Sequence, residues 1–395
     1  MFSSRLPASL ASNRLTDAVR QCRSQGQPFI DLTLANPTLA GFDYPADLLA
    51  RMADPRGLRY EPEPAGMLDA RMAVAADYAR RGVDVAPERI VLTASTSDAY
   101  GLLFKLLTDS GDEVLVPRPS YPLFDHLTRL DQVTAIAYDL DIDGEWSIDF
   151  ASIERALTPR TRAVLLVSPN NPTGSSATHA DLDRLAALCA PRGIAIIADE
   201  VFADYELEPG HAASAGQPLS RPDVLSFGLG GLSKSVGLPQ VKLGWIAVAG
   251  PAPLAAAAME RLELVADTYL SVSTPVQIAV SDLLERGAGV RRQIVARVQT
   301  NYRRLLGAVA ATPSCRVLRS GGGWYAIIQV PTLESEENLV VRLLTSHGVL
   351  THPGYFFDFP RESYLVVSLL PRPETFADGI ARVFRHFDCT EPARS

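Results

Sequence analysis

The middle of the chain alternates short apolar runs with segments that have helical spacing. "DAYGLLFKLL" (98–107) and "PAPLAAAAMERLELV" (251–265) are helical patterns. The apolar runs lie at 89–95, 112–117, 162–169, 193–200, 223–229 and 242–250. Continuous apolar strands separated by helices predict a mostly parallel sheet covered on both faces. Ligands of such sheets bind at the carboxyl ends of the strands.

The pattern changes after about residue 275. A basic helical stretch (291–311), the strand "GGGWYAIIQVP", a helix (335–347), the strand "YLVVSLL" and a last helix follow. These elements predict a smaller α+β domain. "FIDLTLANPT" is typical of an edge segment, which we expect to join that domain. We therefore predict an α/β protein with an N-terminal arm (1–45), a large domain (46–275) and a small C-terminal domain (276–395).

Composition excludes several classes of protein. Hydrophobic residues make up 47% and charged residues 21% of the 395 residues, which is typical of a soluble globular protein. The net charge of -8 argues against non-specific nucleic-acid binding. No apolar run is long enough for a signal peptide or a membrane span, so we expect no membrane partner. Four scattered cysteines without a CxxC pair predict neither a metal site nor a disulfide framework, and they favour the cytoplasm. These cysteines are Cys22, Cys189, Cys315 and Cys389.

Polar residues follow several of the predicted strands. Asp199 ends the strand 193–200, and a carboxylate there is costly unless it meets a cation, caps a helix or reaches solvent. Asn171 lies in "VSPNNPTG", which taken alone predicts a turn. Tyr121, between two prolines, is either a packing aromatic or a flat platform.

A helix start and a lysine complete the set. Ser95, Thr96 and Ser97 begin the helix after the first strand, which suits a phosphate but also an ordinary N-cap. Lys234 lies in the glycine-rich "GGLSKSVGLPQVKLGW" (230–245). A lysine can form a Schiff base with a carbonyl, and a nearby Asp can keep a pyridine nitrogen protonated. Together these residues indicate a pyridoxal-phosphate site.

These motifs, in this order, resemble the class I/II aminotransferases of the fold-type-I pyridoxal-phosphate enzymes. The resemblance extends over nearly the whole chain. Its motifs are "NP" at 36–37, "NNPTG", "DEVF", "SKSVGLPQVKLGW" and "HPGYFF".

The resemblance implies roles around the cofactor ring. Lys234 would hold the cofactor as a Schiff base and move the substrate proton. Asp199 would pair with the ring nitrogen, Asn171 would contact the ring hydroxyl and Tyr121 would stack on the ring. Phe202 stands near the ring where the family commonly has a tyrosine that donates to the ring oxygen.

The resemblance also implies a phosphate end and a substrate end. Thr96 and Ser97, next to Ser95, would hold the phosphate, together with Ser233. Lys242 stands where the family usually has a phosphate-binding arginine. Tyr60 matches a tyrosine that reaches the phosphate of the neighbouring subunit, which implies a homodimer with shared sites. Asn36 is placed at the substrate.

The chain departs from the family at further positions. Gly231 replaces a frequent serine, and Ala35 replaces a glycine. Val366 replaces the arginine that binds the substrate α-carboxylate. Either another cation takes over, or the substrate presents no carboxylate there. Arg372, Arg361 and Arg14 are candidates for that cation, or they are surface residues. His352 either lines the site or is a satisfied structural histidine.

The hypothesis is an aminotransferase that moves an amino group between an amino acid or amine and a keto acid. Because Val366 cannot bind a carboxylate, a lyase or decarboxylase with the same cofactor is the alternative. A third hypothesis is a non-catalytic regulator, which would need a DNA-binding segment. The sequence does not identify the amino donor or the acceptor.

Overall fold

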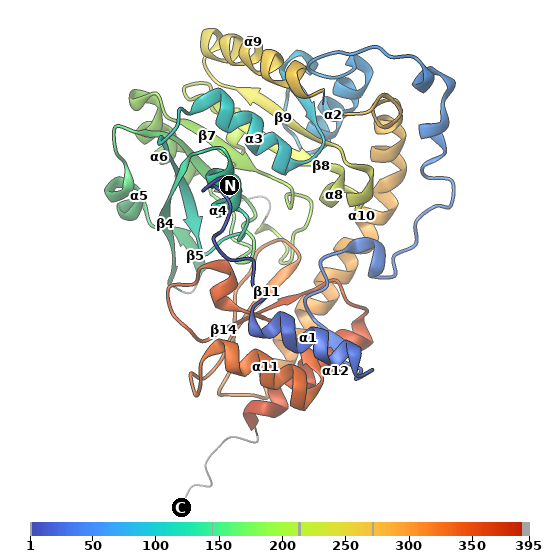
Figure 1. Cartoon of the computed structure of the whole chain (residues 1–395), viewed down its shortest axis with the longest axis vertical. Helices are drawn as coiled ribbons and strands as arrows, with labels where there is room; N and C mark the ends of the chain where they lie inside the picture. Colours follow the sequence, from blue (N-terminus) through green and yellow to red (C-terminus); the bar gives the residue numbers. More distant parts are fainter. Residues whose placement is uncertain (1, 144, 212–214, 271, 389–395) are drawn as a thin grey trace, which may run out of the picture.

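The structure, a computed structural model, describes residues 2–143, 145–211, 215–270 and 272–388. Cys389 lies outside these residues. The described chain contains an eight-stranded sheet, a four-stranded sheet and a two-stranded pair. Figure 1 shows the large sheet with its helices above and the small sheet below.

The large sheet contains each of the predicted apolar runs. Its strands, in order across the sheet, are β2 (Ile90–Thr93), β9 (Gly244–Ala249), β8 (Ser226–Gly231), β7 (Ala195–Asp199), β6 (Thr161–Val167), β3 (Glu113–Arg118), β4 (Thr134–Asp143) and β5 (Glu145–Ile148). The pairs β8–β7, β7–β6, β6–β3 and β3–β4 are parallel. The sheet is mixed, because β9 runs antiparallel to both β2 and β8, and β5 runs antiparallel to β4.

Helices cover both faces of the large sheet, which is why its central strands are apolar throughout. One face packs against α3 (Thr96–Leu107), α4 (Phe124–Leu130) and α9 (Ala252–Tyr269). The opposite face packs against α2 (Leu68–Arg80), α5 (Phe150–Ala156), α6 (His179–Cys189) and the first half of α10 (Thr274–Val309).

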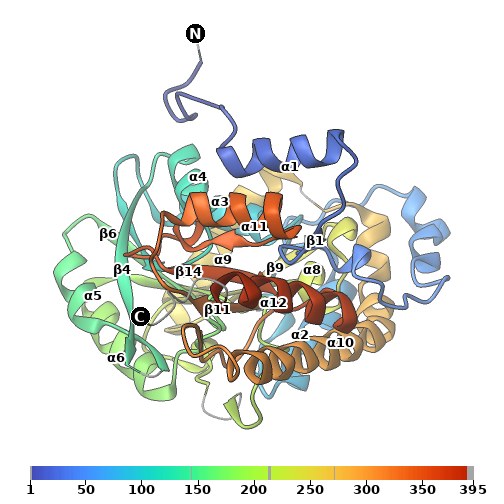
Figure 2. The same cartoon turned by 90° about the horizontal axis from the view of Figure 1, so that it is seen from below.

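The small sheet is antiparallel, in the order β10 (Arg316–Leu318), β11 (Tyr325–Gln329), β14 (Tyr364–Ser368) and β13 (His352–Pro353). Seen from below, α11 (Glu336–His347) and α12 (Pro373–Asp388) lie in front of this sheet, with α1 (Arg14–Ser24) beside α11 (Figure 2). The N-terminal segment also lies here, because β1 (Ile30–Asp31) pairs with β12 (Val349–Leu350).

Helix α10 links the two sheets. It begins at Thr274, well before the predicted start at 291, with a proline in its first turn. Proline at this position costs no hydrogen bond and favours a helix start. Figure 1 shows α10 running from the large sheet down to the small one, so the division at 275/276 falls on a continuous helix and stays a prediction. None of the helices in the described ranges is both long and apolar enough to span a membrane.

Candidate active site

Lys234 lies just beyond the carboxyl end of β8, in the short helix α8 (Leu232–Ser235). Its Nζ atom is 5.1 Å from the ring centre of Trp324 and 5.9 Å from that of Phe202. Burial lowers the pKa of Lys234, and the charge of Asp199 partly opposes this shift. The amine is therefore easier to deprotonate, and hence more nucleophilic, than a surface lysine.

Asp199 is the last residue of the neighbouring strand β7 and is buried. One carboxylate oxygen accepts a hydrogen bond from the Tyr100 hydroxyl at 3.0 Å, and the other accepts from the Val201 N–H at 3.1 Å. Burial raises the pKa of Asp199. No ion pair within the described ranges satisfies this carboxylate, so a ligand cation would lower the cost of its charge.

Asn171 and Tyr121 lie near the same strand ends. Asn171 is buried, and its Oδ1 atom receives no hydrogen bond from the part of the chain that the structure describes. Tyr121 is 40% exposed, and its ring meets Phe124 edge-on. Burial and the charge of Asp199 raise the pKa of Tyr121.

The residues predicted to bind the phosphate lie at the N-terminus of α3. Ser95 is the N-cap, and its hydroxyl accepts from the Asp98 N–H at 3.1 Å. For Ser95 the ordinary capping role is therefore observed. The Thr96 and Ser97 hydroxyls make no hydrogen bond within the described ranges, so both are available to a ligand.

Lys242 lies beside this helix start. Gly244 pairs with Thr93 at the end of β2, which brings the segment before β9 next to α3. Lys242 has a φ of 60° and an exposed side chain, so its charge faces solvent. Ser233 is partly buried in α8.

The glycines that precede Lys234 allow close packing. A Cβ atom at Gly230 would lie 2.5 Å from the indole nitrogen of Trp245, and one at Gly228 would lie 3.0 Å from a Glu200 carboxylate oxygen. A larger residue at either position would push β8 away from its neighbours. The glycines of β8 therefore leave room for these neighbours in the strand that leads to Lys234.

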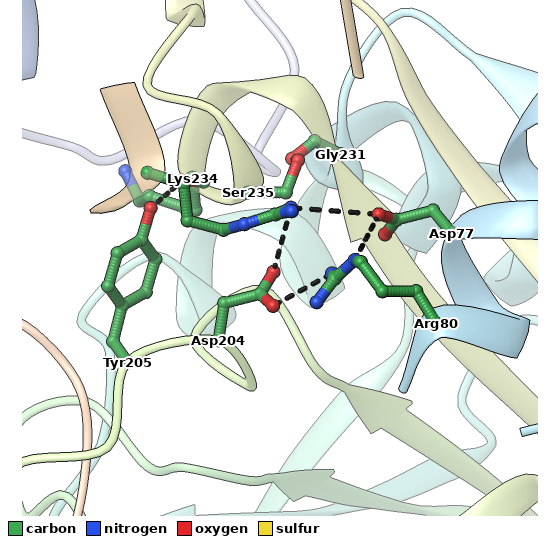
Figure 3. A network of polar contacts seen from close by, with 8 residues as sticks. Asp77, Arg80, Asp204, Tyr205, Gly231, Lys234 and Ser235 are labelled. Atoms are coloured by element: carbon green, nitrogen blue, oxygen red, sulfur yellow. Dashed lines mark hydrogen bonds and ion pairs between the residues drawn. The ribbon is translucent and has the colours of Figure 1, made fainter. Parts of the chain in front are cut away.

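A polar network supports the backbone of Lys234 (Figure 3). The Tyr205 hydroxyl donates to the Lys234 carbonyl oxygen. The preceding residue, Asp204, forms an ion pair with Arg80 at 2.8 Å, and Arg80 also pairs with Asp77 at 2.9 Å. No motif in the sequence predicts this network.

Aromatic rings surround the Lys234 side chain. Trp324 is fully buried and lies edge-on to Phe202 at 5.4 Å and to Tyr205 at 5.1 Å between ring centres. Phe202, which replaces a tyrosine, belongs to this apolar group. Tyr100, Tyr205 and Trp324 are site residues that sequence reasoning missed. Only Tyr100 had a local signal, since it lies one helical turn after Thr96.

Two predicted residues are exposed in the single chain. Tyr60 is 73% exposed and lines a shallow groove with Ala266 and Leu270 of the same chain. Asn36 is exposed and caps a 3₁₀ turn, where its Oδ1 accepts from the Thr38 N–H at 3.0 Å.

The arginine candidates are held elsewhere or exposed. Arg14 pairs with Glu337 at 3.1 Å, and Arg361 donates to the Tyr364 hydroxyl at 3.1 Å. Arg372 is exposed, with its guanidinium against Gly41.

Val366 is fully buried in β14, directly opposite His352 of β13. The His352 ring lies 5.8 Å from that of Phe357, and its Nδ1 atom is buried without a hydrogen-bond partner in the described ranges. Whether His352 lines the site or is a structural histidine stays a prediction.

The residues present fit pyridoxal phosphate. The ring end offers a buried carboxylate without a cation, an amide oxygen without a donor and an amine of lowered pKa. The other end offers a helix N-terminus with two available hydroxyls and a lysine, which suits a phosphate.

Comparisons with known proteins agree. The family model described as "Aminotransferase class I and II" matches residues 27–375. Glutamate-pyruvate aminotransferase AlaA of Escherichia coli strain K12 is 26% identical over 93% of this chain and 92% of its own. Alanine aminotransferase of Mycobacterium tuberculosis is 28% identical over 91% of this chain and 86% of its own.

Solved structures have the same fold. An alanine aminotransferase from Pyrococcus furiosus superposes with a TM-score of 0.86 at 24% identity, over 98% of this chain and 100% of its own. A Thermus thermophilus aspartate aminotransferase variant superposes with a TM-score of 0.85 at 24% identity, over 98% of this chain and 99% of its own. The chain belongs to the class I and II aminotransferases and is a pyridoxal-phosphate-dependent enzyme.

Proposed function

We propose that Lys234 binds the cofactor covalently and moves the substrate proton, and that Asp199 holds the ring nitrogen. The observation that supports both roles is the pair itself: a partly buried amine and a buried carboxylate at adjacent strand ends, with opposite pKa shifts caused by burial. We further propose that Asn171 and Tyr121 contact the ring. Thr96, Ser97, Ser233 and Lys242 would bind the phosphate.

Pyridoxal phosphate supplies an aldehyde that condenses with amines and a protonated ring that withdraws electrons. The residues of the chain do the rest. The Asp199 carboxylate favours a proton on the ring nitrogen. The lowered pKa lets Lys234 take a proton from the substrate carbon and return it. The rings of Trp324 and Phe202 keep water from the amine.

The test uses purified, cofactor-loaded protein. Borohydride reduction should fix the cofactor on the protein, and peptide mapping should locate the label on Lys234. The Lys105→Ala variant is the control, and its labelling should be unchanged. The amine form of the cofactor should then appear with an amino donor. Label on another lysine would refute the role of Lys234, and release of ammonia without the amine form would favour the lyase.

We also propose a homodimer with shared sites. In the single chain Leu58 is 93%, Tyr60 73% and Leu264 71% exposed, and such apolar side chains gain from burial against a second copy. Sedimentation should give twice the chain mass. If Tyr60 serves the neighbouring subunit, mixing Tyr60→Ala with Lys234→Ala subunits should restore part of the activity that each variant lacks.

We propose the cytoplasm as the location. The buried thiols of Cys22 and Cys189 agree with a reducing compartment. Cell fractionation tests this assignment, and recovery of the protein outside the cytoplasmic fraction would contradict it.

A further inference from the structure

On one face of the small sheet, side chains from neighbouring strands form rows across the sheet, and one of these rows includes position 366. Residues directly opposite in an antiparallel pair point to the same face. Ile327, Val366 and His352 therefore form one row, and Tyr325 and Ser368 form the next. In the first row His352 is the only polar side chain.

This face borders the candidate active site. The N–H of Ser120, the residue before Tyr121, donates to the Phe357 carbonyl at 3.0 Å. Tyr325 lies 6.5 Å from Phe357 between ring centres, and burial, with a further contribution from the charge of Tyr121, raises the pKa of Tyr325. His352 in turn lies 5.8 Å from Phe357. The row thus lies on the Tyr121 side of the small sheet.

His352 has a hydrogen-bonding capacity that the chain does not use. Its Nδ1 atom is buried without a partner in the described ranges, although buried polar atoms are nearly always paired. Burial lowers the pKa of His352 to about 4, although the charge of Asp31 partly opposes this shift. The ring is therefore neutral at neutral pH.

No described ion pair or hydrogen bond brings an arginine to this row. The exposed Arg14 and Arg361 have the partners given above, and Arg372 is exposed against Gly41. A carboxylate placed here would lose water without gaining a counter-charge, which is costly. A neutral hydroxyl or amide would lose less and would give Nδ1 a partner.

We propose that His352 and Val366 form a substrate subsite for an uncharged hydrogen-bonding group on the carbon that carries the amine. The preferred donor is then an amino alcohol or amino amide, not a free α-amino acid. This inference rests on the proposed function of the Lys234 site. The reaction stays balanced, because the donor exchanges its amino group and a hydrogen for the carbonyl oxygen of the acceptor.

The experiment compares two matched sets of donors: alanine, 2-amino-1-propanol and alaninamide, and the corresponding phenylalanine compounds. The rate of conversion of the cofactor to its amine form gives kcat/KM for each. We expect a neutral member of a set to exceed the amino acid at least tenfold. Val366→Arg should reverse that order, because it supplies the missing charge.

Variants of His352 test the assignment directly. His352→Phe should lower kcat/KM for neutral donors tenfold or more and for the amino acid much less, while His352→Asn, which keeps a polar atom near Nδ1, should retain most of the rate. His126→Phe, at an exposed histidine, should change nothing. Cofactor content and absorbance report on folding in each variant.

Three results would overturn the subsite. The first is a preference of the wild-type protein for the amino acid in both sets. The second is an unchanged kcat/KM for neutral donors in His352→Phe. The third is an equal loss of kcat/KM for every donor in both His352→Asn and His352→Phe, at full cofactor content. The proposed function survives each of these results. Failure of all six donors with a cofactor-loaded protein would overturn both proposals.

Discussion

Replacing Arg291 by Met should destabilise the folded protein by about 3 kcal/mol. Its guanidinium lies 3.6 Å from carboxylate oxygens of both Asp77 and Asp204, and the three side chains are 7–11% exposed. Each attraction amounts to about 5 kcal/mol at an effective dielectric constant of about 20, and desolvation of the three charges offsets much of the sum. Removal of the cation leaves two buried carboxylates with Arg80 as their remaining described partner.

The free energy of unfolding is measured by urea denaturation, followed by circular dichroism, for both proteins at pH 7. Arg304→Met is the matched control, because Arg304 lies on the same helix but forms an exposed ion pair. It lies 3.9 Å from Glu374, and the two side chains are 42% and 81% exposed, respectively. Exposed pairs contribute under about 1 kcal/mol, so this control should stay near wild type. Because Asp204 precedes Tyr205, Arg291→Met should also weaken cofactor binding.

An Arg291→Met protein as stable as Arg304→Met would refute the reasoning. It would mean that Arg80 alone satisfies both carboxylates, and that the 3.6 Å contacts add no net energy. A stability loss without any loss of cofactor affinity would refute only the second step, from the network to the segment that contains Tyr205.

Further changes test other parts of the structure. Gly174→Ala should lower the free energy of unfolding, measured by urea denaturation, by more than about 2 kcal/mol, because Gly174 has a φ of 68° and its Cβ would overlap the Gly322 carbonyl oxygen. Gly26→Ala is the control: Gly26 has a φ of 65° but no close neighbour, so the loss should be about 1 kcal/mol. The pKa of His352 is about 4 when folded against 6.5 when unfolded, so the folded state binds fewer protons. The free energy of unfolding should therefore fall by about 2 kcal/mol more in wild type than in His352→Asn between pH 7 and 5. Tyr205→Phe should leave the fold intact and lower cofactor affinity by about 1 kcal/mol, measured by titration of the apoprotein.

The large sheet could be predicted because its central strands are buried on both faces, which leaves unbroken apolar runs in the sequence. The hairpin β4–β5 has no such run. The second half of β4, "YDLDID", alternates apolar and polar side chains, as expected for a strand near the edge with one solvated face. The early start of α10 was missed because its first turns are apolar where they pack on the large sheet and become basic only later.

The site followed the same division. Asp199 ends β7 and Lys234 follows the end of the adjacent parallel strand β8, so their proximity follows from the order of the strands. Trp324 reaches Lys234 from the small sheet, 90 residues further along, and no local pattern records that contact. Tyr205 is predicted no better, since its hydroxyl meets a backbone atom and not a side chain.

The residues proposed to bind the cofactor and those proposed to bind the substrate therefore differ in how far a sequence determines them. The first group lies at strand ends of one sheet, and each short motif fixes both the residue and its position. The second depends on the register between β13 and β14, which places His352 opposite Val366. A slip of one residue would put Pro353 in that row and turn the imidazole to the other face. The valine at position 366 predicts only that an arginine is missing, whereas the register shows that His352 is the polar residue opposite this position.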